Sequence, residues 1–170
     1  ILRHHSVYLP IILKEIGVEM PRTVLSHGWW TMAGAKVSKS RGNAVDPIEL
    51  VKKYGVDAFR YFLLREVTLG LDGAFSEDLL VERFNSDLAN DLGNLVLRTT
   101  SMLERYFRGR VPEIGSRPAG VETALLRKMT LSLSEKVKGA MAQFQPNLAL
   151  DFIWEVVREA NRFVEKTKPW

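Results

Sequence analysis

The sequence contains no cysteine among its 170 residues. It therefore has neither a disulfide framework nor a thiolate zinc site, and this absence fits a reducing cytoplasm. It also has no apolar run near the roughly 20 residues that a membrane-spanning helix needs. The first five residues, Ile1 to His5, do not have the form of a signal peptide. We therefore expect a cytoplasmic protein with no membrane partner and no metal site within this sequence.

Positive charge is in only slight excess, and the formal net charge is +4. This balance is compatible with a polyanionic partner such as RNA. Hydrophobic residues make up 46% of the sequence, which is enough to build a buried core. The sequence begins with Ile1 rather than methionine and ends directly after a helical pattern at Trp170. We expect it to be part of a longer chain.

The first third of the sequence alternates between helical and strand-like patterns. Apolar residues at helical spacing predict a helix over 6–16, with Gly17 at its C-terminal cap. The segment 23–31 is rich in β-branched and aromatic residues, which predicts one or two strands. Asp46 and Pro47 are typical of the start of a helix. That helix is expected to break near Gly55 and to restart at Asp57, before a glycine-rich turn over 70–73.

From residue 77 onward the pattern is helical almost throughout, and Ser76 is the expected N-cap. One long helix to about residue 109 is predicted to pack along a single apolar stripe. The stripe comprises Phe84, Leu88, Leu92, Leu95, Thr99, Met102 and Tyr106. Further helices are predicted over 122–141 and from Pro146 onward, the last with Trp154 in its core face. Long helices joined by short loops predict an antiparallel bundle.

The loop from Gly34 to Asn43 carries the clearest chemical signal. It places two lysines and an arginine among small hydroxyl residues, with glycines near both ends. Lysine side chains and loop amides can bind the oxygens of a phosphate chain. Taken by itself, such a loop is more often an exposed basic turn.

The segment Lys36-Val37-Ser38-Lys39-Ser40 resembles the K-M-S-K-S signature of class I aminoacyl-tRNA synthetases, with valine in place of methionine. The segments at 42–43, 46–47, 54–57 and 60–65 are similar to the downstream pattern of that class. The resemblance implies that ATP and its Mg²⁺ are bound here. It implies that Lys39 is catalytic and stabilises the charge that develops on the leaving pyrophosphate. The residues implied to bind ATP are Lys36, Val37, Ser38, Lys39, Ser40 and His27.

Other segments resemble the methionine enzymes of this class in particular. They are 1–5, 8–10, 26–31, 70–76 and 83–95. This resemblance implies that L-methionine and the methionine tRNA are the partners, and that His5 lies near the methionine side chain. His4 and Leu9 depart from the phenylalanine and tryptophan usual in the family. The family's H-I-G-H motif and zinc-bearing insertion are absent from this sequence, so zinc is expected only in a preceding part of the chain.

Asn94 and Arg98 are four residues apart and therefore share one helix face. At about 100° per residue, this face lies away from the predicted apolar stripe. A polar pair of this kind is usually solvated. The resemblance implies instead that both side chains bind bases of the CAU anticodon, and that Trp170 stacks on it. Lys36, Arg41, Arg105, Arg108 and Arg110 could contact tRNA phosphates, and for the last three an ordinary solvated face is the favoured interpretation.

The predicted fold is therefore α/β followed by all-α. Residues 1–33 are expected to end a Rossmann-type domain, 34–80 to form the signature loop and a stem-contact region, and 81–170 to form an incomplete anticodon-binding bundle. The predicted function is that of a methionine–tRNA ligase, with this sequence inactive alone. Two alternatives stay open: a non-catalytic RNA-binding module, and a class I synthetase for leucine, isoleucine, valine or cysteine. The sequence makes no prediction of the oligomeric state.

Overall fold

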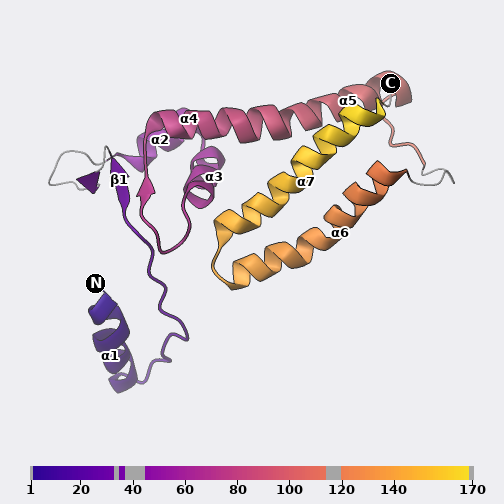
Figure 1. Cartoon of the computed structure of the whole chain (residues 1–170). Helices are drawn as coiled ribbons and strands as arrows, with labels where there is room; N and C mark the ends of the chain where they lie inside the picture. The colour runs from indigo at the N-terminus through magenta and orange to yellow at the C-terminus, as the bar shows by residue number, and fades with distance from the viewer. Residues whose placement is uncertain (1, 33–34, 37–44, 114–119, 169–170) are drawn as a thin grey trace.

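A computed structural model of the chain describes residues 2–32, 35–36, 45–113 and 120–168. Helices predominate over three short strands (Figure 1). In chain order the elements are η1 (His4–Tyr8), α1 (Leu9–Glu15), β1 (Trp30–Met32), β2 (Ala35–Lys36), α2 (Pro47–Tyr54), α3 (Val56–Glu66), β3 (Gly73–Ala74), α4 (Glu77–Arg83), η3 (Phe84–Gly93), α5 (Asn94–Phe107), α6 (Val121–Ala142) and α7 (Pro146–Thr167). Within these described ranges, no helix has the length and apolar character needed to cross a membrane.

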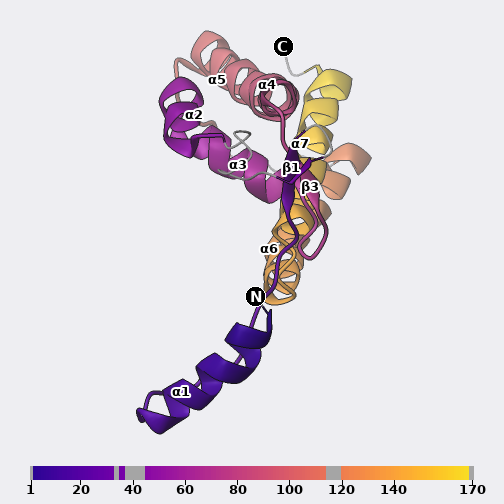
Figure 2. The ribbon, with the colours of Figure 1, turned by 90° about the vertical axis from the view of Figure 1, so that its left-hand side faces the viewer.

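The N-terminal helix stands apart from the other elements, as Figures 1 and 2 show. Elements η1 and α1 confirm the helix predicted over 6–16, and Gly17 follows it with a positive φ of 70°. Several of its apolar side chains, among them Ile11, Ile12 and Ile16, are more than half exposed. The apolar periodicity therefore located this helix correctly, although the described residues leave its apolar face largely uncovered.

The prediction of strand structure over 23–31 was largely wrong. Only Trp30 to Met32 form a strand, and residues 23–28 have no regular secondary structure. A strand exists only where a neighbour completes its backbone hydrogen bonds. Such neighbours meet this segment only at its end, where β1 pairs antiparallel with β2 and parallel with β3. The β-branched residues favoured strand structure, but the sequence could not show which of them would pair with a neighbouring strand.

A small apolar core lies beside this sheet. Phe62 of α3 is fully buried, and its ring lies 5.7 Å from that of Phe75 and 5.9 Å from that of Trp30. Leu50 of α2 and Leu80 of α4 complete the buried cluster. The cluster joins the sheet to three helices, and Met32 and Val45, on the two sides of the basic loop, pack against it.

The helix starts predicted from capping residues are confirmed. The Asp46 carboxylate accepts a hydrogen bond from the Ile48 amide at 2.8 Å, and the Ser76 hydroxyl accepts one from the Leu79 amide at 3.1 Å. Gly55 has φ 86° and separates α2 from α3. A backbone conformation of this kind favours glycine, which has no Cβ.

The long helix from Glu77 to Phe107 is continuous but not uniformly α-helical. Residues Phe84–Gly93 form a π-helix, in which each hydrogen bond spans one more residue than in an α-helix. The prediction of one buried apolar stripe was therefore wrong in part, because a stripe drawn at α-helical spacing drifts across this segment. Phe84 is 39% exposed, whereas Asp87 is buried at 6%.

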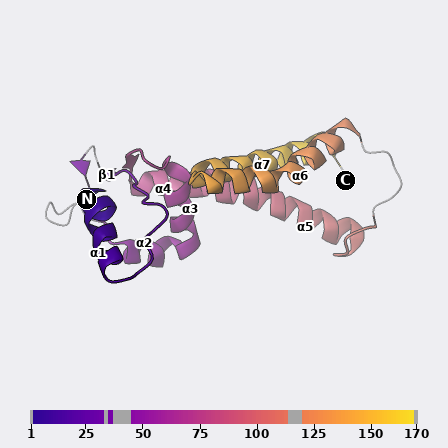
Figure 3. The same cartoon turned by 90° about the horizontal axis from the view of Figure 1, so that it is seen from below.

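Of the predicted antiparallel bundle, the structure shows one closely packed pair. Helices α6 and α7 run side by side in opposite directions (Figure 3). Helix α5 meets α7 and then diverges from the pair toward its own C-terminal end. The bounds of α6 and α7 match the predicted helices, and Trp154 is buried as expected. The face of α5 toward its C-terminal end is therefore less covered than a compact bundle would leave it.

Gly28 is required by a close approach between two chain segments. A Cβ added at this residue would overlap the Leu71 carbonyl and lie 2.7 Å from the Asp72 amide nitrogen. We expect Gly28→Ala to destabilise the complete gene product by about 1–3 kcal/mol, because the two backbones would have to separate. The measurement is the midpoint of thermal unfolding.

Gly139→Ala is the matched control for this substitution. Gly139 lies within α6, and nothing lies within 4 Å of its added Cβ. Alanine there should stabilise the helix by about 0.5–1 kcal/mol. Equal midpoints for the two variants would contradict the close approach at Gly28.

Candidate functional site

The basic loop that follows Lys36 is attached to the small sheet at its first end. Lys36 ends β2, and its backbone pairs with that of Thr31 in β1. At the other end, Val45 packs against the apolar core and Asp46 caps α2. The loop is thus held between a strand and a helix start. Its predicted ATP-binding residues Val37, Ser38, Lys39 and Ser40 lie outside the described residues, as does the side chain of Lys36.

A turn in front of β3 holds the strand that precedes the loop. The Trp29 amide donates a hydrogen bond to the Asp72 carboxylate at 2.7 Å, and the Gly73 amide donates to the Trp29 carbonyl at 2.8 Å. The Phe75 amide donates to the Thr31 carbonyl at 2.8 Å. These bonds tie residues that are more than 40 positions apart in the sequence. The strand and the turn therefore act as one support for the loop.

His27, predicted to lie near the adenylate, is exposed at the start of this support. Its Nδ1 lies 2.7 Å from the carbonyl oxygen of Gly28, so this nitrogen is the donor. His27 also lines a hollow of about 260 Å³ together with Trp29 and Leu71. His5, predicted to lie near methionine, is exposed on η1, which stands apart in Figure 1. Both assignments stay predictions.

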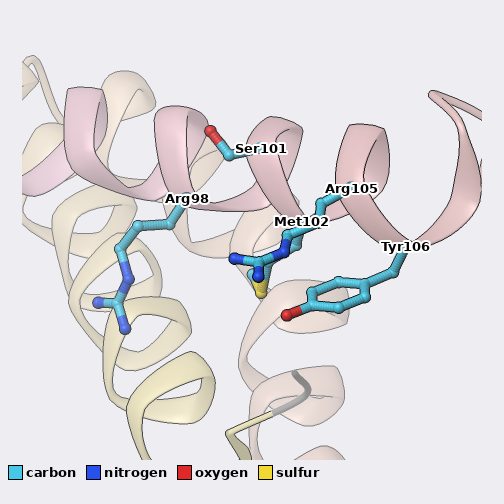
Figure 4. Close-up of a pocket in the computed structure, with 5 residues that line it drawn as sticks. All are labelled: Arg98, Ser101, Met102, Arg105 and Tyr106. Atoms are coloured by element: carbon cyan, nitrogen blue, oxygen red, sulfur yellow. The ribbon is translucent and has the colours of Figure 1, made fainter.

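One face of α5 carries a second candidate site. Asn94 is exposed and Arg98 is half-buried, and both lie near the start of the helix. A hollow of about 390 Å³ continues from Arg98 along the same helix. Its lining residues are Arg98, Ser101, Met102, Arg105 and Tyr106. Figure 4 shows Arg98, Met102, Arg105 and Tyr106 extending to the side of α5 on which α7 lies.

Two arginines, Arg98 and Arg105, line this hollow. Arg65, Arg83 and Arg162 each form an ion pair with a carboxylate. For Arg98 and Arg105, no ion pair or hydrogen bond is found among the described residues. Arginine binds carboxylates and phosphates with a planar set of donors. The hollow therefore presents positive charge that the described residues do not neutralise.

Between the sheet and α5 lies a buried polar cluster centred on Asp87. The Tyr61 hydroxyl donates to the Asp87 carboxylate at 2.6 Å, and Arg65 and Arg83 each approach it at 3.5 Å. Arg65 also pairs with Asp151 of α7 at 2.7 Å. Burial, together with the hydrogen bond to Asp87, raises the pKa of the Tyr61 hydroxyl above its ordinary range. The cluster joins α3, η3 and α7.

Sequence reasoning missed part of the α5 site. It assigned Met102 and Tyr106 to a packed stripe, and for Arg105 it favoured a solvated surface over a contact with a tRNA phosphate. A signal was present, because Asn94, Arg98, Ser101 and Arg105 recur at helical spacing and fall within about 60° of the helix circumference. Among the described residues, no group of three or more His, Asp or Glu side chains could hold a metal ion. Trp170 lies outside the described residues.

The comparison with protein families identifies the class. The profile described as "tRNA synthetases class I (M)" matches residues 1–100. The chain belongs to this family.

Curated relatives of the chain include methionine–tRNA ligases. The one from Caldanaerobacter subterraneus subsp. tengcongensis is 47% identical over 170 residues, covering 100% of this chain and 26% of the relative. The one from Thermotoga maritima is 44% identical and covers 99% of this chain and 26% of its own length. The chain thus spans about a quarter of the length of these relatives.

Solved structures agree with this relationship. Mycobacterium tuberculosis methionyl-tRNA synthetase in complex with methionyl-adenylate matches with a TM-score of 0.91 and 43% identity. The match covers 99% of this chain and 33% of that one. The apo form of the same enzyme matches with a TM-score of 0.86 and 39% identity. The likeness to both structures thus extends over nearly the whole chain.

Proposed function

We propose that the complete gene product is a methionine–tRNA ligase. It activates methionine with ATP to methionyl-adenylate and pyrophosphate, and then transfers the methionyl group to a hydroxyl of the terminal ribose of the methionine tRNA. The observation that carries the proposal is the likeness of nearly the whole chain to a methionyl-tRNA synthetase whose structure contains methionyl-adenylate. The H-I-G-H motif is absent from these 170 residues, so we expect them not to catalyse the reaction alone.

In this proposal the loop over 34–43 acts on the phosphates of ATP. Lys39 stabilises the negative charge that grows on the pyrophosphate as the methionine carboxylate attacks the α-phosphate. Lys36, Val37, Ser38 and Ser40 form the rest of the loop's ATP contact, with Mg²⁺ bound to the nucleotide. The attachment of the loop to a core-packed sheet supports this role, because a phosphate clamp needs fixed ends. Residues 1–33 then belong to the nucleotide-binding domain, with His5 beside methionine and His27 beside the adenylate.

The face of α5 reads the tRNA anticodon in this proposal. The amide of Asn94 and the guanidinium of Arg98 can each form paired hydrogen bonds with base edges. Unpaired loop bases offer such edges together with faces for stacking, which is the role proposed for Trp170. The absence of an ion-pair partner for Arg98 among the described residues supports the role, because its donors stay available.

Aminoacylation by the complete gene product tests the proposal. The unmodified protein should attach methionine to the tRNA with a CAU anticodon far better than to the same tRNA with one anticodon base changed. Arg98→Ala should reduce this discrimination by about 1–3 kcal/mol, since one set of base-edge contacts is lost. The measurement is kcat/KM for the two tRNAs.

Arg98→Lys separates base reading from charge. Lysine keeps the positive charge but loses the planar fork of donors, so it should restore affinity more than discrimination. If Arg98→Ala lowered kcat/KM equally for both tRNAs, the base-reading role would be wrong. If the complete gene product did not attach methionine at all, the ligase assignment itself would fail.

A further inference from the structure

The hollow on α5 extends the candidate RNA-binding face beyond the two residues that the resemblance identified. Asn94, Arg98, Ser101 and Arg105 are spaced by four, three and four residues, so they form one stripe about 16 Å long. The hollow occupies the C-terminal part of this stripe, where α5 diverges from α6 and α7 (Figures 3 and 4). The stripe is therefore longer than a single base contact requires.

The chemistry of the hollow matches a nucleotide. Tyr106 is 45% exposed, and the Arg105 guanidinium lies 5.6 Å from the centre of its ring. Met102 adds a polarisable apolar side chain between Arg98 and Tyr106 (Figure 4). Aromatic rings stack on nucleobases, and arginine donates to phosphate oxygens. The volume of about 390 Å³ is in the range of roughly 300–1,000 Å³ that small-molecule sites occupy.

Charge favours an anionic occupant over a neutral one. None of the described residues that line the hollow is acidic, and within the described ranges neither of its arginines has an ion-pair partner. Lys52 and Lys138 each pair with a glutamate one helical turn away, but most lysines and arginines of the described ranges form no ion pair. Arg105 has instead an aromatic neighbour, which leaves its donors free to meet a phosphate.

We propose that this hollow binds one further nucleotide of the tRNA loop, next to the bases that Asn94 and Arg98 contact. The Tyr106 ring stacks on its base, and Arg105 donates hydrogen bonds to its phosphate. Stacking and phosphate contacts carry little sequence information, so this site contributes affinity and register rather than discrimination. The inference rests on the proposed function, because it takes the RNA to be the tRNA that the ligase aminoacylates.

The test measures binding of the methionine tRNA to the complete gene product at several salt concentrations. Log K falls as log salt rises, and each phosphate contact to single-stranded RNA makes this fall steeper by about 0.7 per unit of log salt. Arg105→Gln should make the slope less steep by about 0.7, and Arg105→Lys should restore most of the steepness. Tyr106→Leu should weaken binding roughly 5- to 150-fold through loss of stacking, whereas Tyr106→Phe should bind normally.

Lys138→Gln is the matched control. It also removes one exposed positive charge. Lys138 lies near the C-terminal end of α6, which is the end of that helix farther from the C-terminal part of α5 (Figure 1). Its salt slope should equal that of the unmodified protein. Equal slopes for the Arg105→Gln and Lys138→Gln variants would overturn the proposal. Normal tRNA binding by Arg105→Gln and Tyr106→Leu with lowered unfolding midpoints would also overturn it, because the hollow would then be covered by protein.

The Arg98 variants distinguish this failure from failure of the proposed function. If Arg98→Ala reduces anticodon discrimination but Arg105→Gln leaves the salt slope unchanged, the ligase proposal stands and the additional nucleotide site is wrong. If Arg105→Gln reduces discrimination as much as Arg98→Ala does, Arg105 reads a base, and the site as proposed is wrong. If the complete gene product does not bind the methionine tRNA, both proposals fail.

Discussion

Lys39→Ala in the complete gene product should slow methionyl-adenylate formation by about 10²–10³-fold. A lysine that contacts the leaving phosphates stabilises charge that is larger in the transition state than in the bound ATP. Its loss therefore lowers kcat more than it raises KM for ATP. The affinity for tRNA should change little. The measurements are methionine-dependent ATP–pyrophosphate exchange and equilibrium binding of the tRNA.

Lys52→Ala is the control for the loss of one nearby lysine. Lys52 lies on α2, is largely exposed and pairs with Glu49 at 2.7 Å. Exposed pairs of this spacing contribute only about 0.2–0.5 kcal/mol, so exchange by this variant should be close to normal. Comparable losses of exchange in the Lys39→Ala and Lys52→Ala variants would show that the exchange rate depends on the net positive charge of this region and not on a specific contact of Lys39. A Lys39→Ala protein with normal exchange and weakened tRNA binding would favour a non-catalytic RNA-binding role for the loop.

Asp87→Ala should destabilise the protein by about 3–5 kcal/mol. The substitution leaves the buried Arg65 without one of its two carboxylates and removes the acceptor of the Tyr61 hydroxyl. Removing one member of a buried ionic cluster costs far more than the pair contributes, because the remaining charge stays desolvated. The measurement is the midpoint of thermal unfolding of the complete gene product.

Two further variants define the origin of this loss. Asp87→Asn keeps an acceptor for Tyr61 but removes the charge, so its unfolding midpoint should lie between those of the alanine variant and the unmodified protein. Asp151→Asn removes the charge of the other carboxylate that pairs with Arg65. Because the Asp151 side chain is 41% exposed, this substitution should lower the free energy of unfolding less than Asp87→Ala does. A midpoint of Asp87→Ala equal to that of the unmodified protein would contradict a structural role for the cluster.

Local signals in the sequence predicted where most helices begin and end. The side chains of Asp46 and Ser76 satisfy backbone amides of the turns that follow them, and such bonds form within a few residues. Gly55 separates α2 from α3, because its positive φ is a backbone conformation that glycine adopts without a steric clash. These features depend only on neighbouring residues, so their spacing in the sequence was enough to find them.

The candidate sites were predictable to different extents. The composition of the loop over 34–43 indicated phosphate chemistry, and the assignments of Lys39, Asn94, Arg98 and Trp170 came from resemblance and stay predictions. The hollow beside Arg98 was not predicted. Its Met102 and Tyr106 are apolar or aromatic residues at helical spacing, which in most helices face a core. Whether they face a core or a hollow depends on where α7 lies relative to α5.

Tertiary structure alone decided three features of this protein. It placed the π-helical segment around Asp87, it gave strand neighbours to β1 and not to residues 23–28, and it set α5 at an angle to α6 and α7. Each depends on contacts between segments tens of residues apart, and no periodicity within one segment reports such contacts. The sequence by itself determined the helices, their caps and the basic loop, because hydrogen bonds and apolar spacing over a few residues specify them.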